Sequence, residues 1–487
     1  MPLPMISLRK IPGTVAFLGC GDLVANRFCH DSRLVQPGDV FIAIRGVSVD
    51  GQSFAANAVR AGAVAIITDR PLAGLPVPQC IVRDPRASRA WIAMAQQDFP
   101  AARMTLAGIT GTNGKTTTAW LLRSILKANN LRTGLIGTIE YSDGLYSRTA
   151  ALTTPDPEEL AFLLQRMTAC DATHCVMEIS SHALHQRRCS PLRLSAAAIT
   201  NITRDHLDYH GSPEAYLASK LLIADLLTPD TPLLLGTDDP GCRTAAEQLP
   251  HVPRRSFGFA SDCDLRVQVQ QADAAGQRLL LDLEHGSIEI TTPLIGSHNA
   301  LNLLAAAALA EQLQVPHAAI VRGLEEVAGV PGRMEAVNAG QSFSVFIDFA
   351  HTPDSLRLAM QTLQPITPGR LIVVFGAGGD RDRDKRPLMA QAVANAEIII
   401  VTSDNPRTER PQQIIDEICA GFADTSRVTR CTDREAAIQM ALKVAEPGDT
   451  VLIAGRGHET TQQIQNRQIH FDDRRVAARI LRELLAK

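Results

Sequence analysis

A glycine-rich segment near residue 110 carries the clearest chemistry of the chain. It reads GITGTNGKTTTAW, in which a β-branched run enters a glycine-rich turn that is followed by Lys115, Thr116 and a helix-forming stretch. Backbone N–H groups at a helix N-terminus favour phosphate groups, so Lys115 is expected to reach the β- and γ-phosphates of ATP and the Thr116 hydroxyl to bind Mg²⁺. The strict phosphate-loop spacing would have glycine at Ile109, which Gly108 and Gly111 flank instead. The segment therefore predicts a variant phosphate loop.

Three polar groups follow other predicted strands of the same region. Glu178 lies in the segment MEISSH, Asp205 and His206 lie in TRDHLDYH, and Lys220 lies in EAYLASKLL. Each of these residues alone is more often a solvated surface group than a catalytic one. Their shared position favours a common site instead, because functional groups gather at the carboxyl ends of strands in an α/β domain.

The C-terminal third of the sequence holds four further polar segments behind predicted strands. They read IDFAHTPDSL, GAGGDRDRDKRP, SDNPRTE and AGRGHET. A guanidinium group binds a carboxylate through two parallel hydrogen bonds, so Arg381 and Arg407 on adjacent strand ends would form a carboxylate receptor. The alternative interpretation is that both arginines are surface residues paired with nearby aspartates.

An α/β fold is needed to position these groups. Short β-branched runs alternate with helical stretches along most of the chain, which is typical of mostly parallel sheets. Residues 256–294 differ, because their alternating apolar residues predict antiparallel strands. We therefore predict three domains. They are a small N-terminal α/β domain (1–102), a central doubly wound domain of the phosphate-loop type with an added antiparallel segment (103–330), and a C-terminal Rossmann-like α/β domain (331–487).

Length and composition agree with a multidomain globular protein. The chain has 487 residues, of which 45% are hydrophobic and 20% charged, and its formal net charge is -3. That balance argues against disorder, and the lack of a basic run argues against nucleic-acid binding. No apolar run reaches the length of a membrane span. Ten scattered cysteines without a CxxC pair indicate free thiols, so we expect a cytoplasmic protein.

The phosphate loop, MEISSH, DHLDYH and DNPR together resemble the motifs of the Mur ligase family. The resemblance extends over nearly the whole chain, from DSR at Asp31 to DDRRVA at Asp472. It implies an ATP-dependent, amide-bond-forming ligase of peptidoglycan precursor synthesis. By resemblance, the N-terminal domain binds the UDP end of the precursor, the central domain binds ATP, and the C-terminal domain binds the incoming amino acid. The expected state is a monomer.

The implied reaction explains why charged groups are needed. ATP would phosphorylate the D-glutamyl γ-carboxylate of UDP-N-acetylmuramoyl-L-Ala-D-Glu, and the amino group of meso-diaminopimelate would then displace phosphate. Both partners are anionic, so charge neutralisation is the main task. By resemblance, Lys115, Glu178, His206 and Lys220 are the catalytic residues. Lys220 matches a lysine that is carbamylated in the family, and a carbamate would attract Mg²⁺ whereas an ammonium would repel it.

The resemblance also assigns ligand contacts residue by residue. The metal ligands are Thr116, Glu178, His206 and Lys220 as its carbamate. The ATP contacts are Gly111, Thr112, Asn113, Gly114, Lys115, Thr116, Thr117, Asn299, Arg333 and His351. The contacts of the UDP-linked dipeptide are His30, Ser32, Val47, Ser48, Val49, Thr153, Thr154, Ser180, Gln186 and Arg188. The diaminopimelate contacts are Arg381, Asp404, Asn405, Pro406, Arg407, Gly455 and Glu459. His298 stands where the family usually has phenylalanine.

Arg407 decides which amino acid is expected. Diaminopimelate carries a carboxylate and an ammonium at its far end, whereas lysine carries the ammonium alone. Arg407 would pair with the far carboxylate, and the lysine-adding relatives lack an arginine at this place. Leaving a buried Arg407 without a carboxylate would cost on the order of a few kcal/mol, so lysine should be rejected.

Three alternatives stay open at this point. A lysine-adding Mur ligase is disfavoured by Arg407. A folylpolyglutamate synthase shares the phosphate-loop ligase chemistry, but the additional N-terminal domain and the DNPR segment argue against it. A nucleotide-binding regulator on the same fold is disfavoured because all the reactive groups are present.

Overall fold

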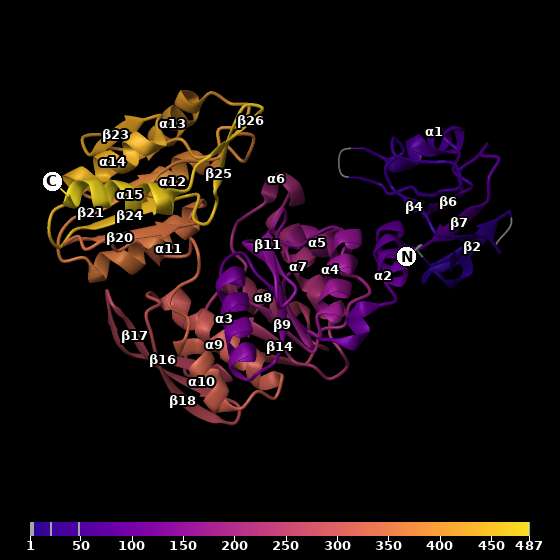
Figure 1. Cartoon of the computed structure of the whole chain (residues 1–487), viewed down its shortest axis with the longest axis horizontal. Helices are drawn as coiled ribbons and strands as arrows, with labels where there is room; N and C mark the ends of the chain where they lie inside the picture. The colour runs from indigo at the N-terminus through magenta and orange to yellow at the C-terminus, as the bar shows by residue number, and fades with distance from the viewer. Residues whose placement is uncertain (1–3, 20–21, 47–48, 487) are drawn as a thin grey trace. The chain divides into compact units, whose positions relative to one another are not determined.

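The computed structural model describes residues 4–19, 22–46 and 49–486, and Figure 1 draws the chain. Two compact units are each built from three chain segments. The first comprises Met1–Thr110, Asn130–Ala197 and Ser219–Leu233, and the second comprises Gly111–Asn129, Ala198–Ala218 and Leu234–Lys487. Helices alternate with strands in both units, so the predicted α/β class is confirmed. The predicted domain boundaries stay predictions.

The first unit begins with a small sheet that is parallel except for β2. Its inner strands are short and wholly buried, because β-branched and other apolar residues face both sides. Helix α2 (Pro85–Gln96) begins where the Asp84 side chain accepts hydrogen bonds from two backbone N–H groups. In sheet order the strands are β2 (Thr14–Leu18), β7 (Gln79–Val82), β6 (Ala65–Thr68), β5 (Val40–Ile42) and β4 (Phe28–Cys29). The other elements here are β1 (Ile6–Ser7), β3 (Val24–Ala25) and α1 (Ala55–Arg60).

A second set of strands in the first unit positions Glu178. Strand β12 (His174–Glu178) lies between β8 (Thr105–Thr110) and β9 (Thr133–Ile136) and is parallel to both. Glu178 ends β12 opposite Ile109, so it lies at the carboxyl edge of these strands. This is the edge at which α/β domains place functional groups. The other elements here are β10 (Glu140–Ser142), β11 (Ser147–Thr149), α4 (Pro157–Ala169) and α5 (Ser181–His185).

The second unit contains α3 (Lys115–Ala128), which follows the predicted phosphate loop. It packs against α9 (Ser297–Gln312) and α10 (His317–Glu325). Alanines make up much of α9 and are buried there, which allows close helix packing. Helix α10 approaches α3 closely at Gly323, where a Cβ atom would lie 2.3 Å from the Ile125 Cα.

An antiparallel segment follows in the second unit, as predicted for residues 256–294. Strands β16 (Leu265–Asp273), β17 (Gly276–Leu283) and β18 (Gly286–Thr292) pair antiparallel over almost their whole lengths. Alternate residues of β17 and β18 are buried, which is the period-2 pattern that the sequence contained. The neighbouring elements are α6 (Leu207–His210), β14 (Leu233–Gly236), α8 (Pro240–Gln248) and β15 (Arg254–Gly258). Three elements cross the division between the units: strand β13 (Ala196–Ile199), helix α7 (Pro213–Leu221) and β14, of which Leu233 belongs to the first unit.

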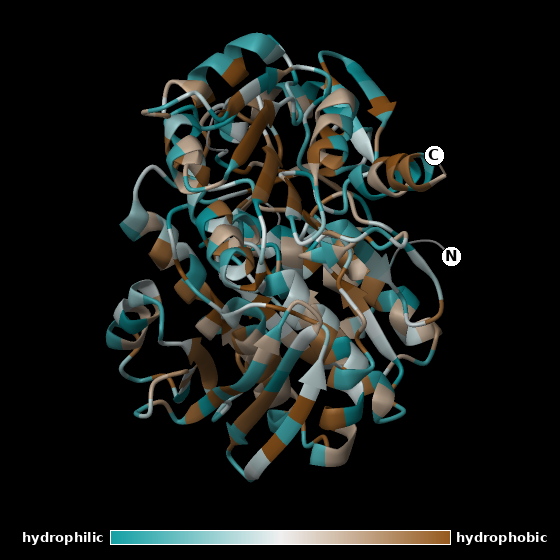
Figure 2. Ribbon diagram, turned by 90° about the vertical axis from the view of Figure 1, so that its left-hand side faces the viewer, coloured by the Kyte–Doolittle hydropathy of each residue, from teal (hydrophilic) through white to brown (hydrophobic). Residues whose placement is uncertain are grey.

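The C-terminal part of the second unit is an open sheet in the order β19-β20-β24-β21-β22-β23, parallel except for β19. Successive strand residues belong to two apolar clusters, so both faces are covered: α11, α12 and α13 pack on one face, and α14 and α15 on the other. In Figure 2 the strands of this sheet are largely brown between helices of mixed colour. The predicted Rossmann-like sheet is therefore confirmed.

The bounds of these elements show that each polar segment begins where a parallel strand ends. The strands are β19 (Glu335–Ala336), β20 (Ser344–Asp348), β21 (Leu371–Phe375), β22 (Ile398–Thr402), β23 (Val428–Cys431) and β24 (Thr450–Ala454). The helices are α11 (Pro353–Leu363), α12 (Lys385–Val393), α13 (Pro411–Cys419), α14 (Arg434–Val444) and α15 (Asp473–Leu485).

Among the helices of residues 4–19, 22–46 and 49–486, none combines the length and the hydropathy that a membrane crossing requires.

A short hairpin supports the segment after β22. Its strands are β25 (Thr461–Ile464) and β26 (Arg467–His470). The backbone N–H of Arg407 donates to the Gln463 carbonyl oxygen at 3.1 Å, and the Gln465 N–H donates to the Arg407 carbonyl oxygen at 2.6 Å. The hairpin thus fixes the backbone on both sides of Arg407.

Candidate active site

The loop between β8 and α3 takes a shape that only glycine allows at two positions. Gly111 and Gly114 have φ angles of +146° and +85°. A Cβ atom at Gly111 would lie 1.9 Å from the Thr200 Oγ1, and one at Gly114 would lie 2.3 Å from the Asn302 Oδ1. The predicted phosphate loop is therefore packed tightly against α9 and against the segment after β13.

Asn201 accepts hydrogen bonds from the backbone of this loop. Its carbonyl oxygen accepts a hydrogen bond from the Thr112 N–H at 2.9 Å, and its side-chain Oδ1 accepts one from the Asn113 N–H at 2.9 Å. The Thr200 hydroxyl donates to the Asn113 carbonyl oxygen at 2.6 Å. These bonds preorganise the N-terminus of α3, where phosphate groups are favoured. Sequence reasoning did not assign Thr200 and Asn201, and their position directly after a strand was the available signal.

The side chains of three predicted ATP contacts, Lys115, Thr116 and Arg333, lie at this loop. The Lys115 ammonium donates to the Gly111 and Thr112 carbonyl oxygens, at 2.8 Å each. The Thr116 hydroxyl accepts a hydrogen bond from Arg333 Nη2 at 3.1 Å, and the Arg333 guanidinium lies 4.6 Å from the centre of the Phe349 ring. Two cations therefore lie where the negative charge of a triphosphate could be neutralised.

A cavity of about 360 Å³ adjoins the loop. Asn113 and Gly114 line one part of it, and Phe257, His298 and Leu301 give another part an apolar and aromatic character. Burial lowers the pKa of His298 to about 4, so this imidazole is neutral near pH 7. A neutral imidazole can pack against a flat aromatic ligand.

Asn299 and Thr117 lie inside the unit rather than at the cavity. Both are buried, and neither lines the cavity beside the loop. Asn299 donates to the Ile295 carbonyl oxygen at 2.8 Å and accepts from Asn302 Nδ2 at 3.2 Å. The Asn302 side chain in turn lies against Gly114, where an added Cβ atom would come within 2.3 Å of Asn302 Oδ1. The structure therefore gives Asn299 an indirect place beside the predicted ATP site, and Asn302, which sequence reasoning did not assign, a direct one.

A second cavity, of about 340 Å³, gathers polar side chains from the carboxyl edge of the C-terminal sheet. The segments after β20, β21, β22 and β24 line it together with residues 204–208. Six of the seven predicted diaminopimelate contacts are among the lining residues, namely Arg381, Asp404, Asn405, Arg407, Gly455 and Glu459. His206 and His351 line it as well, whereas Pro406 does not.

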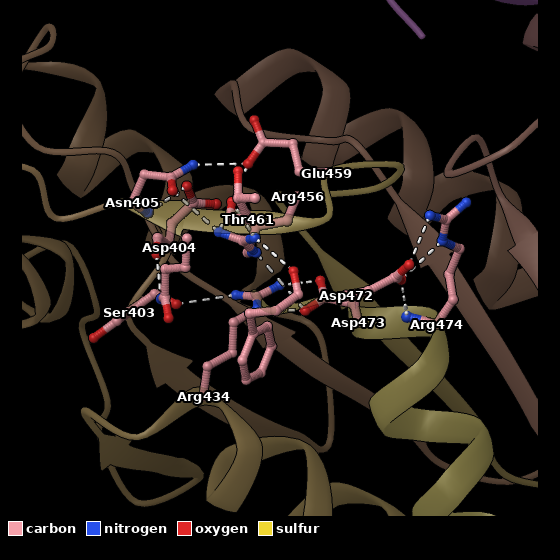
Figure 3. Close-up of polar contacts among 12 residues, drawn as sticks. Ser403, Asp404, Asn405, Arg434, Arg456, Glu459, Thr461, Asp472, Asp473 and Arg474 are labelled. Atoms are coloured by element: carbon pink, nitrogen blue, oxygen red, sulfur yellow. Dashed lines mark hydrogen bonds and ion pairs between the residues drawn. The ribbon is translucent and has the colours of Figure 1, made fainter. Parts of the chain in front are cut away.

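Carboxyl groups of Asp404 and Glu459 line one part of this cavity, and Figure 3 draws their polar contacts. Asp404 is buried, and its Oδ2 has no hydrogen-bond partner within the part of the chain that the structure describes. Glu459 accepts a hydrogen bond from Asn405 Nδ2 at 2.8 Å. Burial and the charge of Asp404 raise the pKa of Glu459. Glu459 Oε2 also lies 3.7 Å from Arg456 Nη1. Two carboxyl groups that line the same cavity suit the ammonium group of a ligand.

Two arginines line the same cavity. Arg407 has a φ angle of +51°, and its Nη1 donates to the Gly379 carbonyl oxygen at 2.6 Å. Burial and the positive charge of Arg381 lower the pKa of Arg407, although a guanidinium stays protonated at neutral pH. Neither arginine belongs to any of the ion pairs found among the described residues. Two neighbouring guanidinium groups suit the carboxylate of a ligand.

Asp205 and Lys385 also line this cavity, and sequence reasoning assigned no ligand to either. Lys385 begins α12, and its Nζ donates to the His351 carbonyl oxygen at 3.1 Å. Burial lowers the pKa values of both Lys385 and His351. Burial opposes the charge of Asp205, yet His206 and His351 hold its pKa below the ordinary value. The cavity thus contains a further cation and a further carboxylate.

In the first unit, Glu178 is the centre of a buried hydrogen-bond network. Its Oε1 accepts from the Thr138 N–H at 2.8 Å, and its Oε2 accepts from the Thr138 hydroxyl at 2.9 Å. The Thr138 hydroxyl lies 3.1 Å from that of Thr153. The Thr154 hydroxyl donates to the Glu178 carbonyl oxygen at 2.9 Å and accepts from the Ser180 N–H at 3.0 Å. Three predicted dipeptide contacts therefore surround Glu178.

Arg188 extends this network. Its Nη1 donates to the Thr154 carbonyl oxygen at 2.8 Å, and its Nε and Nη2 donate to Gln186 Oε1 at 3.0 and 2.8 Å. A guanidinium in this place could bind an anionic group of a substrate. The structure thus brings together, with Glu178, the residues Thr153, Thr154, Ser180, Gln186 and Arg188.

The other predicted contacts of the first unit lie in different surroundings. His30 and Val49 are exposed, and Ser32 is partly buried. Val47 and Ser48 lie outside the described residues. Lys220 lies near the end of α7 and is 1% exposed. A polar side chain that is this deeply buried requires strong polar partners.

The predicted metal ligands come from both units. Glu178 and Lys220 belong to the first unit, and Thr116 and His206 belong to the second. His206 has a φ angle of +51°, and its Nε2 lies 3.3 Å from Asp205 Oδ2. Carboxylate, hydroxyl and carbamate oxygens are ligands of the kind that Mg²⁺ prefers, so Thr116, Glu178 and carbamylated Lys220 fit this ion, whereas the His206 imidazole is a nitrogen ligand that Mg²⁺ does not favour. The metal site stays a prediction.

Three family descriptions match the chain in order along its length. The Mur ligase family catalytic domain matches residues 28–93, the Mur ligase middle domain matches residues 109–310, and the Mur ligase glutamate ligase domain matches residues 332–457. Most of the site described above lies within the second and third of these ranges.

Individual relatives agree with the family descriptions. A protein of Geobacillus kaustophilus (strain HTA426), named UDP-N-acetylmuramoyl-L-alanyl-D-glutamate--2,6-diaminopimelate ligase, is 42% identical over 485 residues, which cover 98% of both chains. A solved structure of a ligase with the same name has 30% identity and a TM-score of 0.67, and the match covers 99% of this chain and 100% of that one. A folylpolyglutamate synthase of Mycobacterium tuberculosis is 20% identical with a TM-score of 0.65, over 82% of this chain and 95% of its own, and shares the fold. The chain therefore belongs to the Mur ligase family.

Proposed function

We propose that the protein is an ATP-dependent ligase that joins meso-2,6-diaminopimelate to UDP-N-acetylmuramoyl-L-alanyl-D-glutamate in peptidoglycan precursor synthesis. The observation that carries this proposal is the cavity at the edge of the C-terminal sheet, where Arg381 and Arg407 share one space with Asp404 and Glu459. The name of the Geobacillus kaustophilus relative, which matches over 98% of both chains, supports it.

The cavity suits a ligand with more than one amino-acid centre. Asp404 and Glu459 offer carboxyl groups to an ammonium, and Arg381 and Arg407 offer guanidinium groups to a carboxylate. Lysine has no carboxylate at its far end, so it would leave an arginine uncompensated in a partly buried place. Such a loss costs more than the missing contact alone, because the arginine has already lost water on entering the cavity. Diaminopimelate satisfies both sets of groups.

Activation of the acceptor requires phosphoryl transfer. A carboxylate oxygen of the D-glutamyl residue attacks the γ-phosphorus of ATP, and ADP leaves with the electron pair of the broken P–O bond. Lys115 and Arg333 lie at the phosphate loop, where they neutralise charge that develops on the phosphate oxygens. Mg²⁺, when it is bound by Thr116, Glu178, His206 and carbamylated Lys220, supplies further charge neutralisation.

Amide formation then consumes the acyl phosphate. The amino nitrogen of diaminopimelate attacks the carbonyl carbon, phosphate leaves from the tetrahedral intermediate, and the nitrogen gives up its extra proton. Arg188, Thr154 and Ser180 form a polar network beside Glu178 that suits the anionic dipeptide. His30, Ser32 and residues 47–49 would hold the UDP end. The nucleotide-linked substrate places the reaction in the cytoplasm, and a monomer would suffice for it.

Carbamylation of Lys220 is part of the proposal. Only 1% of this residue is exposed. A buried ammonium beside a magnesium site would repel the ion, whereas a carbamate would attract it. The modification therefore turns a cation that opposes catalysis into an anion that supports it.

Phosphate release by the purified protein tests the function. The assay contains ATP, Mg²⁺ and UDP-N-acetylmuramoyl-L-Ala-D-Glu, and it compares meso-diaminopimelate with L-lysine. Turnover with diaminopimelate alone is expected. Turnover with lysine would keep the ligase and overturn the specificity, and turnover with neither would favour the folate ligase or the regulator.

A further inference from the structure

Arg456 is completely buried directly behind the cavity that gathers the proposed amino-acid contacts. It follows β24 and lies between Gly455 and the loop that carries Glu459. Its Nη1 donates to Asn405 Oδ1 at 3.1 Å, and its Nη2 donates to the carbonyl oxygens of Thr461 at 2.8 Å and Phe471 at 3.1 Å (Figure 3). Arg456 does not line the cavity itself.

These contacts determine which way the Asn405 amide faces. Asn405 Oδ1 accepts from Arg456 Nη1 and also from the Gln463 N–H at 2.9 Å. Both partners can only donate, so the oxygen of the amide must face them. The NH₂ group therefore lies on the other side, where one proton is donated to Glu459 Oε2 at 2.8 Å. Asn405 lines the cavity, so its second proton is available to an acceptor on the ligand.

The burial of Arg456 needs an explanation beyond stability. Burial and the charge of Arg434 both lower the pKa of Arg456. Asp473, fully buried, lies 3.9 Å from Arg456 Nε but is already bonded to Arg434, at 2.8 and 2.7 Å. Buried ion pairs of this kind are often no more stabilising than apolar side chains of similar volume. A charged group in such a place is better explained by the orientation that it imposes on Asn405.

We propose that Arg456 is a positioning residue for the amino-acid substrate. It holds Asn405 as a hydrogen-bond donor toward the cavity. It acts on Glu459 through Asn405 and also directly, because its Nη1 lies 3.7 Å from Glu459 Oε2. The group that faces Asn405 Nδ2 is then an acceptor, and a carboxylate of diaminopimelate supplies one. This inference rests on the proposed ligase function.

Kinetics of Arg456→Met and Arg456→Lys test the inference. Loss of a hydrogen bond to a charged ligand group should raise the KM for diaminopimelate about tenfold or more in Arg456→Met. The KM for ATP and kcat at saturating diaminopimelate should each change less than about threefold. Arg456→Lys keeps a donor and should recover part of the loss. Arg479→Met, which removes an exposed arginine of α15, is the matched control and should leave all three constants unchanged.

A double-mutant cycle separates positioning from general destabilisation. If Arg456 acts through Asn405, the double variant Arg456→Met/Asn405→Ala should have a KM for diaminopimelate less than about twofold above that of Asn405→Ala alone. Asn405→Asp tests the donor directly without disturbing Arg456, because its second oxygen would replace the NH₂ group, and it should raise the same KM about tenfold or more. Additive effects in the cycle, or an unchanged KM in Asn405→Asp, would overturn the proposal. Failure of the unmodified protein to turn over diaminopimelate would instead overturn the proposed function.

Discussion

Replacement of Arg407 by methionine should weaken diaminopimelate specifically. The side chain lines the cavity, and the ion pairs found among the described residues do not include it, so its charge is available to a ligand carboxylate. A hydrogen bond to a charged group contributes about 1.5–3 kcal/mol, and about 1.4 kcal/mol corresponds to a factor of ten. The kcat/KM for diaminopimelate should therefore fall about 10- to 100-fold in Arg407→Met.

The backbone should tolerate this change. Arg407 already has a φ angle of +51°, and methionine meets the same conformational cost as arginine there. The hairpin bonds to Gln463 and Gln465 use backbone atoms alone, so they persist in the variant. Removal of Arg407 also relieves repulsion with Arg381, which places the expected loss nearer the lower end of the range. Thermal unfolding should consequently change little.

Paired kinetics with diaminopimelate and lysine measure the effect. Lysine makes no carboxylate contact with Arg407, so the ratio of kcat/KM values for the two amino acids should shrink by nearly the factor lost for diaminopimelate. The KM for ATP should stay within about twofold, because the phosphate loop lies elsewhere. Arg410→Met removes an exposed arginine from the same segment and serves as the control. Equal increases in both KM values, or an unchanged preference for diaminopimelate, would refute the assignment of Arg407.

Three further predictions concern the other parts of the site. Gly114→Ala should abolish ATP-dependent phosphate release, because its Cβ would lie 2.3 Å from Asn302 Oδ1 at a φ angle of +85°; nucleotide binding at the level of the unmodified protein would contradict this. Lys220→Ala should remove turnover while leaving the folded structure detectable by circular dichroism, and added short carboxylic acids should restore part of the activity; full activity without them would exclude the carbamate. His298→Phe should make stability less sensitive to acid. The pKa of His298 is about 4 in the folded protein against an ordinary 6.5, so the unfolded state takes up the proton first and stability is lost as the pH falls from 6.5 toward 4. Melting temperatures at pH 7 and pH 5 should differ less in His298→Phe than in the unmodified protein, and an equal difference would contradict the assignment.

Much of the C-terminal site could be predicted because strand ends in a parallel sheet meet at one edge. The segments with His351, Arg381, Asp404 and Glu459 each follow a separate strand, and the order β20-β24-β21-β22 places those strands side by side. Sequence alone could indicate that each segment follows a strand, but it could not give the order of the strands. Lys385 and Asp205 show the consequence, because both lie in segments that follow predicted strands, but the sequence did not indicate that they line the same cavity.

Predictions from matched motifs and from geometry diverge at α9. The resemblance predicts that Asn299 contacts the nucleotide, whereas its side chain is buried and bonds to Ile295 and Asn302. Asn302 lies against Gly114 instead. Both residues lie one turn apart on the same helix, so the sequence pattern could not tell which of them faces the loop.

The sequence by itself determined the glycine-rich loop, the helix after it and the α/β class, because turns, helix starts and strand periodicity depend on neighbouring residues in the chain. The tertiary structure alone decided that Arg456 turns the amide of Asn405, and that Arg333 reaches the hydroxyl of Thr116. These partners are separated by tens to hundreds of residues, and a side chain's hydrogen-bond partner at such separation depends on how the strands are ordered and packed. Composition and spacing carry no information about that order.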